Sequence, residues 1–392
     1  MKVAVAGSGI IGLWTAYELT KYGHEVTVYS NAPVNATTSS SAVAVITPLF
    51  PWDRVSDPVA FEQSLKWYYE TLAEFLRLNV GNDFLNIVPS YEFGYVDENN
   101  DRVLEKAFSV TKLRDLNFAP LEILSVTNPI QVKNDDQDTH QVSFAAHFDA
   151  DMVDTQVFLP LFEQILRHRG VRFSHQVFAS REDILDTLDE PVVFNCLGMN
   201  AKYVFPDLQT EMHPTRGQSH FIRIDLEPPY FGIASGHHAV FRHKRGYYLG
   251  SYFLEDARYT HRTKQRIDAN APPWVELNTF PTSDVFELTK GFIRESYPRL
   301  AYAVGREPDE MLIRSIDASP DDSNIPLAYK VWRMNTGIRP MRESGPYCSV
   351  ESQGERTIVH HFGHGAHGWT IGYGSTKEAV RTWMNSIGES HE

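Results

Sequence analysis

Residues 2–12 read KVAVAGSGIIG, and this stretch decides the fold of the chain. It opens with the apolar run 3–6, which is short enough for a buried parallel strand. Three glycines follow at once, Gly7, Gly9 and Gly12. Gly7 allows a tight turn, Gly9 lets a pyrophosphate approach the backbone, and Gly12 lets a helix pack closely on the strand. The spacing predicts a turn that binds phosphate groups.

The segments after this turn supply the context that the glycine pattern needs. Residues 10–22 read as a helix that stops at Gly23, a typical helix-ending residue. The run 26–29 is the next expected strand. The start of the helix offers free N–H groups and the positive end of its dipole to phosphates. Strand, glycine turn, helix and strand in this order predict a dinucleotide-binding unit.

Length and composition fit a globular enzyme with a small substrate. The 392 residues exceed one ordinary core, and 42% of them are hydrophobic, as in typical globular proteins. No apolar stretch is long enough for a membrane span, and glycines interrupt the only signal-like run at the start. The net charge of −14 disfavours nucleic acid and anionic membranes as partners. The presence of only two cysteines fits a reducing cytoplasm. The sequence leaves open whether the protein forms a homodimer.

The later segments return twice to the pattern of the nucleotide-binding unit. A helix is expected over 157–168 and a buried strand with a small-residue turn over 192–198. The chain after 331 reads as strand, loop and final helix. Between these pieces, 218–253 alternates like an antiparallel sheet. The nucleotide-binding part is therefore discontinuous, which favours a flavoprotein over a simple NAD dehydrogenase, whose nucleotide half is usually one piece.

We predict a mixed α/β fold with α+β character and two domains. A discontinuous Rossmann-like domain binds the cofactor, and a second domain with an antiparallel sheet binds the substrate. The second domain opens with a helix expected over 58–78, where apolar residues recur at three- and four-residue spacing. The cofactor domain comprises 1–55, 145–205 and 328–392, and the substrate domain comprises 56–144 and 206–327.

Three further parts of the chain resemble the D-amino acid oxidase family of FAD enzymes. The first is the Ser/Thr-rich run TTSSSAVA that leads into Thr-Pro, within 37–48. The second is PTRGQ at 214–218, and the third joins GIRPMR at 337–342 to HFGHGAHGWTI at 361–371. With the N-terminal motif, these segments bracket nearly the whole chain. The resemblance implies an FAD-binding α/β fold and an oxidase of amino acids.

The resemblance also implies where FAD lies. Ser30 and Asn31 stand where many flavoproteins place an acidic residue for the adenosine ribose, and they would bind it more weakly than a carboxylate. The glycine loop 365–368 lets N–H groups reach the ligand, and the helix expected over 370–384 would stabilise negative charge on reduced flavin. The other residues expected to contact FAD are grouped by the part of the cofactor that they would meet. These are the pyrophosphate (Gly7, Gly9, Ile11, Gly12), the phosphates and ribityl chain (Thr38, Ser39), the flavin ring (Ala44, Val45, Thr47), the adenosine side (Val177, Gly198) and the pyrimidine edge of the flavin (Gly365, Ala366, Gly368, Trp369, Thr370).

Arg339 is the main candidate for the catalytic site. Its neighbours match the G-x-R-P of the family, whose arginine binds the substrate carboxylate, and a planar guanidinium suits a bidentate carboxylate. It would place the Cα–H of the substrate against flavin N5. A structural ion pair is the alternative, and it fits Arg342 better. The resemblance implies hydride transfer to flavin, hydrolysis of the imine to a 2-oxo acid and ammonia, and reoxidation by oxygen to hydrogen peroxide, with no general base if the amine enters neutral.

The substrate pocket departs from the family. Relatives place tyrosines before a sheet strand, where they touch substrate and form a lid, but the matching stretch 235–241 has none. Tyr248 and Tyr252 share one face of the next strand and are catalytic candidates, either facing the pocket or packed in the sheet. His237 and His238 are candidates to bind a polar or acidic side chain, with exposed loop histidines as the alternative. Thr47, which would line the flavin ring, is a further catalytic candidate.

The histidines and cysteines need separate interpretations. Four histidines within 360–367 resemble a metal site only loosely, because His360 and His361 fall on opposite faces of a strand. No metal is therefore expected. Cys196 lies in a buried strand and is expected in the core. Cys348 could tether flavin covalently, as in some relatives, but it lacks a matching context.

The leading hypothesis is an FAD-dependent oxidase of an amino acid, acting on CH–NH₂ or CH–NH donors with molecular oxygen. One alternative is an oxidase or dehydrogenase of a secondary or cyclic amine in a biosynthetic pathway. A second alternative is an NAD-dependent dehydrogenase, which the discontinuous domain and the C-terminal glycine loop disfavour. A third is a non-catalytic flavin-binding protein. The residues do not decide the substrate or its stereochemistry.

Overall fold

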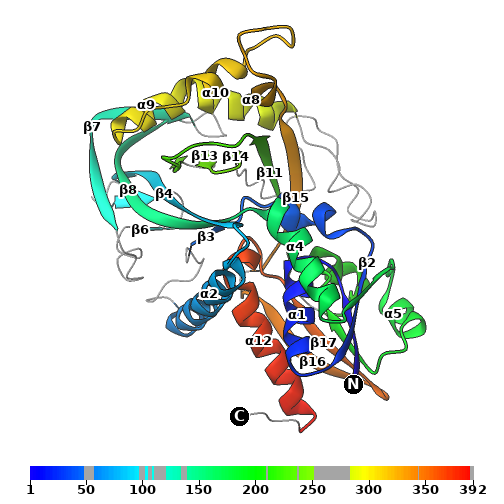
Figure 1. The fold of residues 1–392 in the computed structure, drawn as a ribbon. Coiled ribbons are helices and arrows are strands. Elements are labelled where there is room, and N and C mark those ends of the chain that lie inside the picture. Colours follow the sequence, from blue (N-terminus) through cyan, green and yellow to red (C-terminus); the bar gives the residue numbers. More distant parts are fainter. Residues whose placement is uncertain are drawn as a thin grey trace.

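The computed structural model describes residues 1–47, 57–96, 102–104, 108–109, 121–133, 139–208, 211–235, 238–250, 283–342 and 344–388. These residues form two sheets with helices on both. Figure 1 shows the larger sheet, with β4, β7 and β8, above the smaller sheet and its helices. The N-terminus and the last described residues, up to 388, lie at the lower edge, beside the smaller sheet. The mixed α/β fold predicted from the sequence is confirmed.

The smaller sheet is built from the beginning, the middle and the end of the chain. Its central strand β1 is fully buried from Val3 to Ala6 and pairs in parallel with β2 and β10. This arrangement explains why strand β1 is apolar on both faces. The order across the sheet is β16 (Tyr347–Gln353), β17 (Arg356–Phe362), β10 (Val192–Asn195), β1 (Lys2–Ala6), β2 (Glu25–Ser30) and β9 (Arg172–His175).

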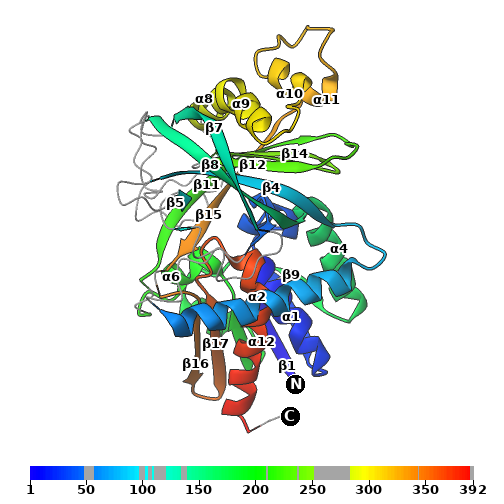
Figure 2. The same cartoon turned by 90° about the vertical axis from the view of Figure 1, so that its left-hand side faces the viewer.

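Four long helices pack around this sheet close to the predicted positions. α1 spans Ile10–Lys21, α2 spans Pro58–Asn79, α4 spans Thr155–His168 and α12 spans Gly368–Ser386. Helix α1 ends just before Gly23, whose φ of +74° favours glycine. Figure 2 shows α2 lying across α12 and α1. Helix α2 therefore packs on the nucleotide-binding helices, although its residues fall in the predicted substrate domain.

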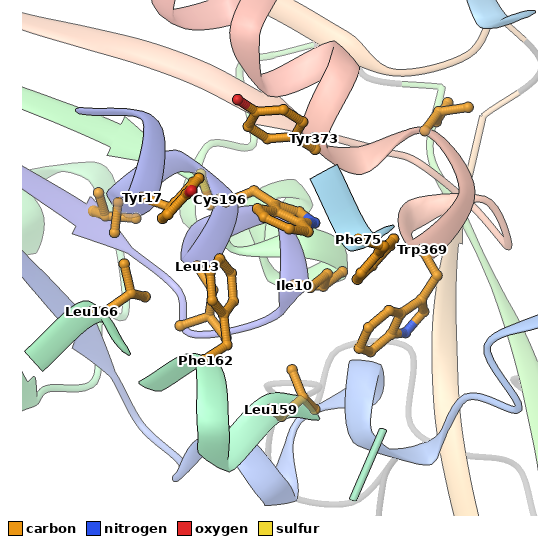
Figure 3. Close-up of a cluster of buried hydrophobic side chains, with 14 of the residues drawn as sticks. Ile10, Leu13, Tyr17, Phe75, Leu159, Phe162, Leu166, Cys196, Trp369 and Tyr373 are labelled. Atoms are coloured by element: carbon orange, nitrogen blue, oxygen red, sulfur yellow. The ribbon is translucent and has the colours of Figure 1, made fainter. Parts of the chain in front are cut away.

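Aromatic rings from all four helices form one core. Trp14 of α1 lies 4.5 Å from Phe162 of α4 and 5.3 Å from Phe75 of α2, between ring centroids. Phe75 stacks on Trp369 at the start of α12, with ring centroids 6.0 Å apart. Figure 3 shows Phe75, Phe162 and Trp369 in this cluster. The core therefore holds the start of α12 in place.

The larger sheet is mostly antiparallel, as the alternation after residue 218 predicts. Strand β12 is the exception, because it pairs in parallel with β4. The main path runs β15 (Arg333–Met341), β11 (His213–Arg223), β14 (Gly246–Gly250), β13 (His238–His243), β12 (Phe231–Ser235), β4 (Leu85–Val96), β5 (Arg102–Leu104) and β6 (Phe108–Ser109), while β8 (Thr139–Val153) pairs with β4, β7 (Glu122–Lys133) and β3 (Val45–Ile46).

The two faces of the larger sheet have different partners. One face packs on helices through a core that contains Ile222, Val240, Leu249 and Phe292. Successive side chains of a strand alternate between faces, so the odd-numbered residues of β13 point to the opposite face. The covering helices, drawn in yellow in Figure 1, are α8 (Ser283–Gly291), η5 (Phe292–Ser296), α9 (Tyr297–Ala303) and α10 (Glu310–Ser315).

The strand pairing does not follow the residue ranges expected for the two domains. Strands β3 and β15 and the second half of β8 belong to the larger sheet, although the sequence placed them in the cofactor domain. The reason is hydrogen bonding to distant strands, which local patterns do not encode. The domain boundaries themselves stay a prediction. The smaller elements are η1 (Val34–Ala36), η2 (Thr38–Ser41), α5 (Arg181–Thr187), η4 (Gly198–Asn200), α6 (Ala201–Val204) and α11 (Leu327–Lys330).

Among the described helices, none combines the length and the apolar character that crossing a bilayer requires.

Candidate functional site

A cavity of about 960 Å³ is lined by residues of both sheets. From the smaller sheet it receives the turn after β1, the end of β10 and the loop before α12. From the larger sheet it receives parts of β4, β11, β12, β13 and β15. The predicted cofactor residues that line it are Gly7, Gly9, Ile11, Ser30, Asn31, Thr38, Ser39, Ala44, Val45, Thr47, Val177, Gly198, Gly365, Ala366, Gly368, Trp369 and Thr370.

The turn after β1 has the predicted local geometry. Gly7 has a φ of +116°, which favours glycine, and its N–H donates to the carbonyl of Tyr29 at 2.8 Å. The side chain of Ser39 accepts a hydrogen bond of 2.9 Å from the N–H of Ile10, at the start of α1. A Cβ on Gly9 would lie 3.3 Å from this Ser39 hydroxyl oxygen. The turn therefore exposes backbone to the cavity.

Gly12 is the exception among the three glycines. It does not line the cavity. A Cβ at this position would overlap the carbonyl oxygen of Gly7. Gly12 therefore allows α1 to pack on the turn, as its place in the motif predicts, and a contact of Gly12 with the pyrophosphate stays a prediction.

At the end of β2, Ser30 and Asn31 reach the cavity beside Val177. The hydroxyl of Ser30 accepts a hydrogen bond of 2.7 Å from Ser8 and donates one of 2.8 Å to the carbonyl of Ala32. This hydroxyl therefore stabilises its own loop. A hydrogen bond from Ser30 to a ribose stays a prediction.

The loop between β17 and α12 forms the second glycine turn. Gly365 has a φ of +57°, and its N–H donates to the carbonyl of Pro340 in β15 at 3.0 Å. No side chain caps the start of α12. A Cβ on Gly368 would lie 3.5 Å from the Ile10 side chain, at the start of α1. Two helix N-termini therefore meet at the cavity, and their positive ends suit an anionic ligand.

Arg339 projects from β15 into the cavity and lies over β11. A Cβ on Gly217 would be 2.5 Å from its guanidinium nitrogen Nη1, so the guanidinium lies directly on this glycine. Burial lowers the pKa of Arg339 to about 10, and the side chain stays charged at neutral pH. Burial, followed by the nearby charge of Arg339, lowers the pKa of His367 to about 4. The cavity thus contains a charged guanidinium group beside a neutral imidazole.

The segment after η2 reaches the cavity from the other side. Ala44 has a φ of +54°, which is uncommon for a residue with a side chain, and its carbonyl accepts from the N–H of Val153 at 3.0 Å. Thr47 lines the cavity at the end of this segment. Such backbone strain is found most often at ligand sites.

Two substrate candidates pack against other aromatic rings. Tyr248 does not line the cavity: it is 1% exposed and stacks on Phe221 with ring centroids 4.6 Å apart. The ring of His238 stacks on Phe292 at 4.9 Å, within the core on the helix-covered face. Its even position in β13 turns the side chain away from the cavity, which it borders. Tyr252 and His237 lie outside the described residues.

The four histidines near the C-terminus have different surroundings. His360 contacts Asn195 at 3.0 Å and Glu351 at 3.1 Å. His361 and His364 both contact the hydroxyl of Ser375 in α12, at 3.3 and 2.9 Å. Burial lowers the pKa of His361 to about 3. In the part of the chain that the structure describes, no three histidine, cysteine or acidic side chains are placed to hold a metal ion.

The two cysteines differ in their surroundings. Cys196 lines the cavity, packs in the core of the smaller sheet, and has a pKa raised by burial to about 12. Cys348 is exposed on β16 and does not line the cavity. The position of Cys348 therefore does not support a covalent bond to flavin.

Sequence reasoning missed several cavity residues of the larger sheet, notably Glu92, Ala234 and Ser219. Glu92 lies on β4, in the stretch SYEFG over 90–94. Aromatic residues at 91 and 93 pack in the helix-covered core, so the even positions face the cavity. This alternation was the signal available in the sequence.

The chain matches the family model described as DAO, FAD dependent oxidoreductase, over residues 2–382. It is 22% identical to D-aspartate oxidase 1 of Caenorhabditis elegans, over 99% of this chain and 98% of that protein. It is 23% identical to D-amino-acid oxidase of Streptomyces coelicolor, over 97% and 96%. Among solved structures, iminodiacetate oxidase from a Chelativorans species shares the fold, with a TM-score of 0.61, 14% identity, and 100% and 96% coverage. This chain belongs to the DAO family of FAD-dependent oxidoreductases.

Proposed function

We propose that this enzyme oxidises an amino acid at its Cα–N bond and passes the electrons to oxygen. In the net reaction, the amino acid, O₂ and water become a 2-oxo acid, ammonia and hydrogen peroxide. The carbon–nitrogen bond loses two electrons and two protons to form an imine, and water then replaces the nitrogen. The two electrons and two protons reduce O₂ to the peroxide.

The observation that carries this proposal is the position of Arg339. Arg339 is half-buried, and its guanidinium lies on Gly217 of the larger sheet and reaches the cavity that also contains the start of α12. A planar guanidinium binds a carboxylate through two parallel hydrogen bonds, which orients the attached Cα. Positioning of this kind supplies a large part of the rate enhancement in reactions without a general base.

The residues around the cavity fit FAD. The helix starts at Ile10 and Gly368 would meet the phosphates and the flavin, and the strained segment at Ala44 would lie along the flavin ring. FAD, when bound, supplies the acceptor for the hydride that leaves Cα. The other residues predicted to contact FAD, except Gly12, line the cavity.

The protein supplies few groups for proton transfer. Burial lowers the pKa of His361, His364 and His367, so these side chains are neutral near pH 7. The substrate amine therefore enters neutral or loses its proton to solvent. Of the candidates for this site, Tyr248 packs on Phe221 without lining the cavity, and His238 points to the helix-covered face.

The names of relatives support an amine or amino acid as substrate, since they include a D-aspartate oxidase and a D-amino-acid oxidase. The name of the structural neighbour iminodiacetate oxidase extends the range to secondary amines. Peroxide as product, a homodimer and a cytoplasmic location stay predictions from the sequence.

The test is a substrate panel on the FAD-loaded enzyme. D- and L-amino acids, N-alkyl amino acids and cyclic amino acids are mixed with the enzyme without oxygen, and loss of the oxidised flavin absorbance is followed. Peroxide is then measured in air. Bleaching by a primary amino acid with peroxide release supports the proposal. Bleaching only by N-alkyl or cyclic compounds favours the secondary-amine alternative, and bound flavin with no bleaching favours a non-catalytic protein.

Substitution of Arg339 tests its role in binding the carboxylate of the substrate. We expect Arg339→Leu to retain flavin and to lose kcat/KM by at least about a hundredfold, because a charged hydrogen-bonded pair and the orientation are both lost. Arg342→Leu is the matched control, since Arg342 donates to the carbonyl of Gly345 at 2.6 Å and does not line the cavity. Equal activity of Arg339→Leu and the native enzyme would remove Arg339 from the site.

A further inference from the structure

Glu92 places a carboxyl group in the cavity on the larger sheet. It belongs to β4, lines the cavity together with Ser90, and is half-buried. Among the described residues, none forms a hydrogen bond or an ion pair with this carboxyl. Burial raises its pKa to about 7. A polar group in such a position is costly unless a ligand supplies the missing partner.

Strand register shows that Glu92 and Arg339 share one face of the sheet. Across the strands, Glu92 pairs with Ala234, and Ala234 pairs with Ala239. Ser219 of β11 lies on this face too, two residues from the Gly217 that supports the Arg339 guanidinium. Both charged groups therefore project into the same space.

The sheet face between the Arg339 guanidinium and Glu92 forms the floor of the cavity, and its side chains are small. Ser219, Ala239 and Ala234 line the cavity between β11 and β4. The next row of the same face is bulky, because Phe221, Tyr248 and Phe241 pack there against one another. The cavity is thus closed on the bulky side and extends along the small side chains until it reaches Glu92.

The distance along this floor is large. Four strand-to-strand steps separate β11 from β4, which amounts to about 19 Å along a flat sheet. Twist and curvature of the sheet shorten the straight line between the ends. A ligand that reaches from the guanidinium to the carboxyl must therefore have a long chain.

The position of Glu92 excludes FAD phosphates as its partner. The two helix N-termini that suit phosphates belong to the smaller sheet, at Gly9 and Gly368, and a carboxylate would repel these groups. Arg339 already offers the cation for a ligand carboxylate. The partner that Glu92 lacks is a cation on the same ligand.

We propose that Glu92 binds a cationic group at the far end of the substrate, whose carboxylate is held by Arg339. The substrate is then an amino acid with a long, positively charged side chain. Acidic amino acids, the substrates named for the aspartate-oxidase relatives, are disfavoured because their second carboxylate would meet Glu92. This inference rests on the proposed function for the use of Arg339 as the carboxylate anchor.

The test uses ligands that cannot be oxidised at Cα. Straight-chain alkanoates from butanoate to dodecanoate are compared with ω-aminoalkanoates of equal length, which differ only in the terminal ammonium. The dissociation constants are measured on the FAD-loaded enzyme at pH 8 from the change in flavin absorbance. We expect the amino ligand to bind at least about tenfold more tightly at the matching lengths, as close charge pairs at desolvated sites do.

Glu92→Gln keeps the shape of the side chain and removes its charge. We expect this variant to lose the preference for amino ligands and to bind alkanoates within about twofold of the native enzyme, because only the charge pair is removed. Asp151→Asn is the matched control. Burial also raises the pKa of Asp151, to about 6, but this residue of β8 does not line the cavity, so the ratio should persist.

Three results would overturn the inference. The first is equal binding of the two ligand series at every length. The second is a preference that survives in Glu92→Gln, and the third is no binding of either series. Failure of the proposed function appears elsewhere, as a flavin that no amine in the substrate panel reduces, because the binding titration requires no turnover.

Discussion

At the scale of single residues, the site depends on the absence of a side chain at Gly217. Gly217 has no Cβ, and the Arg339 guanidinium occupies that space. Its φ lies outside the left-handed region, so the requirement for glycine is one of space and not of backbone conformation. The R-G-Q resemblance located this glycine, and the structure supplies the physical reason for its small size.

We expect Gly217→Ala to displace the guanidinium and to lower kcat/KM by about tenfold to a hundredfold, because small errors of position at a reacting centre have effects of this size. Alkanoate dissociation constants and peroxide formation measure the change. Gly291→Ala is the matched control, since a Cβ there meets nothing within 4 Å. Unchanged alkanoate binding in Gly217→Ala would contradict this account.

At the scale of elements, helix α2 connects the start of α12 to the rest of the core. Its inward residues Phe75 and Phe61 are 0% and 3% exposed, whereas Leu76 is 50% exposed. Phe75 stacks on Trp369, which lines the cavity in the first turn of α12. The packing of α2 therefore supports the position of the second glycine loop.

We expect Phe75→Ala to lower the free energy of unfolding by about 3–5 kcal/mol, as large-to-small changes in a tight core do, and to weaken FAD binding through Trp369. Urea unfolding and FAD titration measure the two effects. Leu76→Ala, one position along the same helix, should change stability by less than about 1 kcal/mol. Equal effects of the two substitutions would show that α2 does not support the cavity.

At the scale of the whole molecule, the cavity between the sheets contains a carboxyl group whose burial is unfavourable. Burial raises the pKa of Glu92 from its usual 4.5 to about 7. The folded chain then binds more protons than the unfolded chain between these values, so this group lowers stability as pH rises. Its neighbours on the sheet face, Ala146 and Ala234, carry no charge. Of the other titratable groups in the cavity, the histidines at 361, 364 and 367 are neutral in this range, and Arg339 stays charged.

We therefore expect Glu92→Gln to stabilise the substrate-free holoenzyme more at pH 8 than at pH 5, by up to about 2 kcal/mol. Chemical denaturation at the two pH values measures the difference between this variant and the native enzyme. The exposed Glu307, changed to Gln, is the control and should show no such dependence. A difference of the opposite sign would mean that a cationic partner already stabilises the ionised Glu92.

The nucleotide-binding part could be predicted because its signals are local. The order of strand, glycine turn and helix at 2–21 depends on the conformational limits of nearby residues, and the confirmed helices α1, α2, α4 and α12 follow the same kind of signal. The glycine loop before α12 and the position of Arg339 came from motifs that resemble a family, whose membership is confirmed.

The substrate side required the tertiary structure, because strand faces depend on register. Shifting a strand by one residue exchanges its two faces, and the partners of β4, β13 and β15 are distant in sequence. Register turns His238 toward Phe292, brings Tyr248 into a packed row, and directs Glu92 into the cavity. The sequence by itself determined the cofactor fold through short-range sterics and helix dipoles. The tertiary structure alone decided which side chains face the substrate, because pairing between distant strands sets that choice.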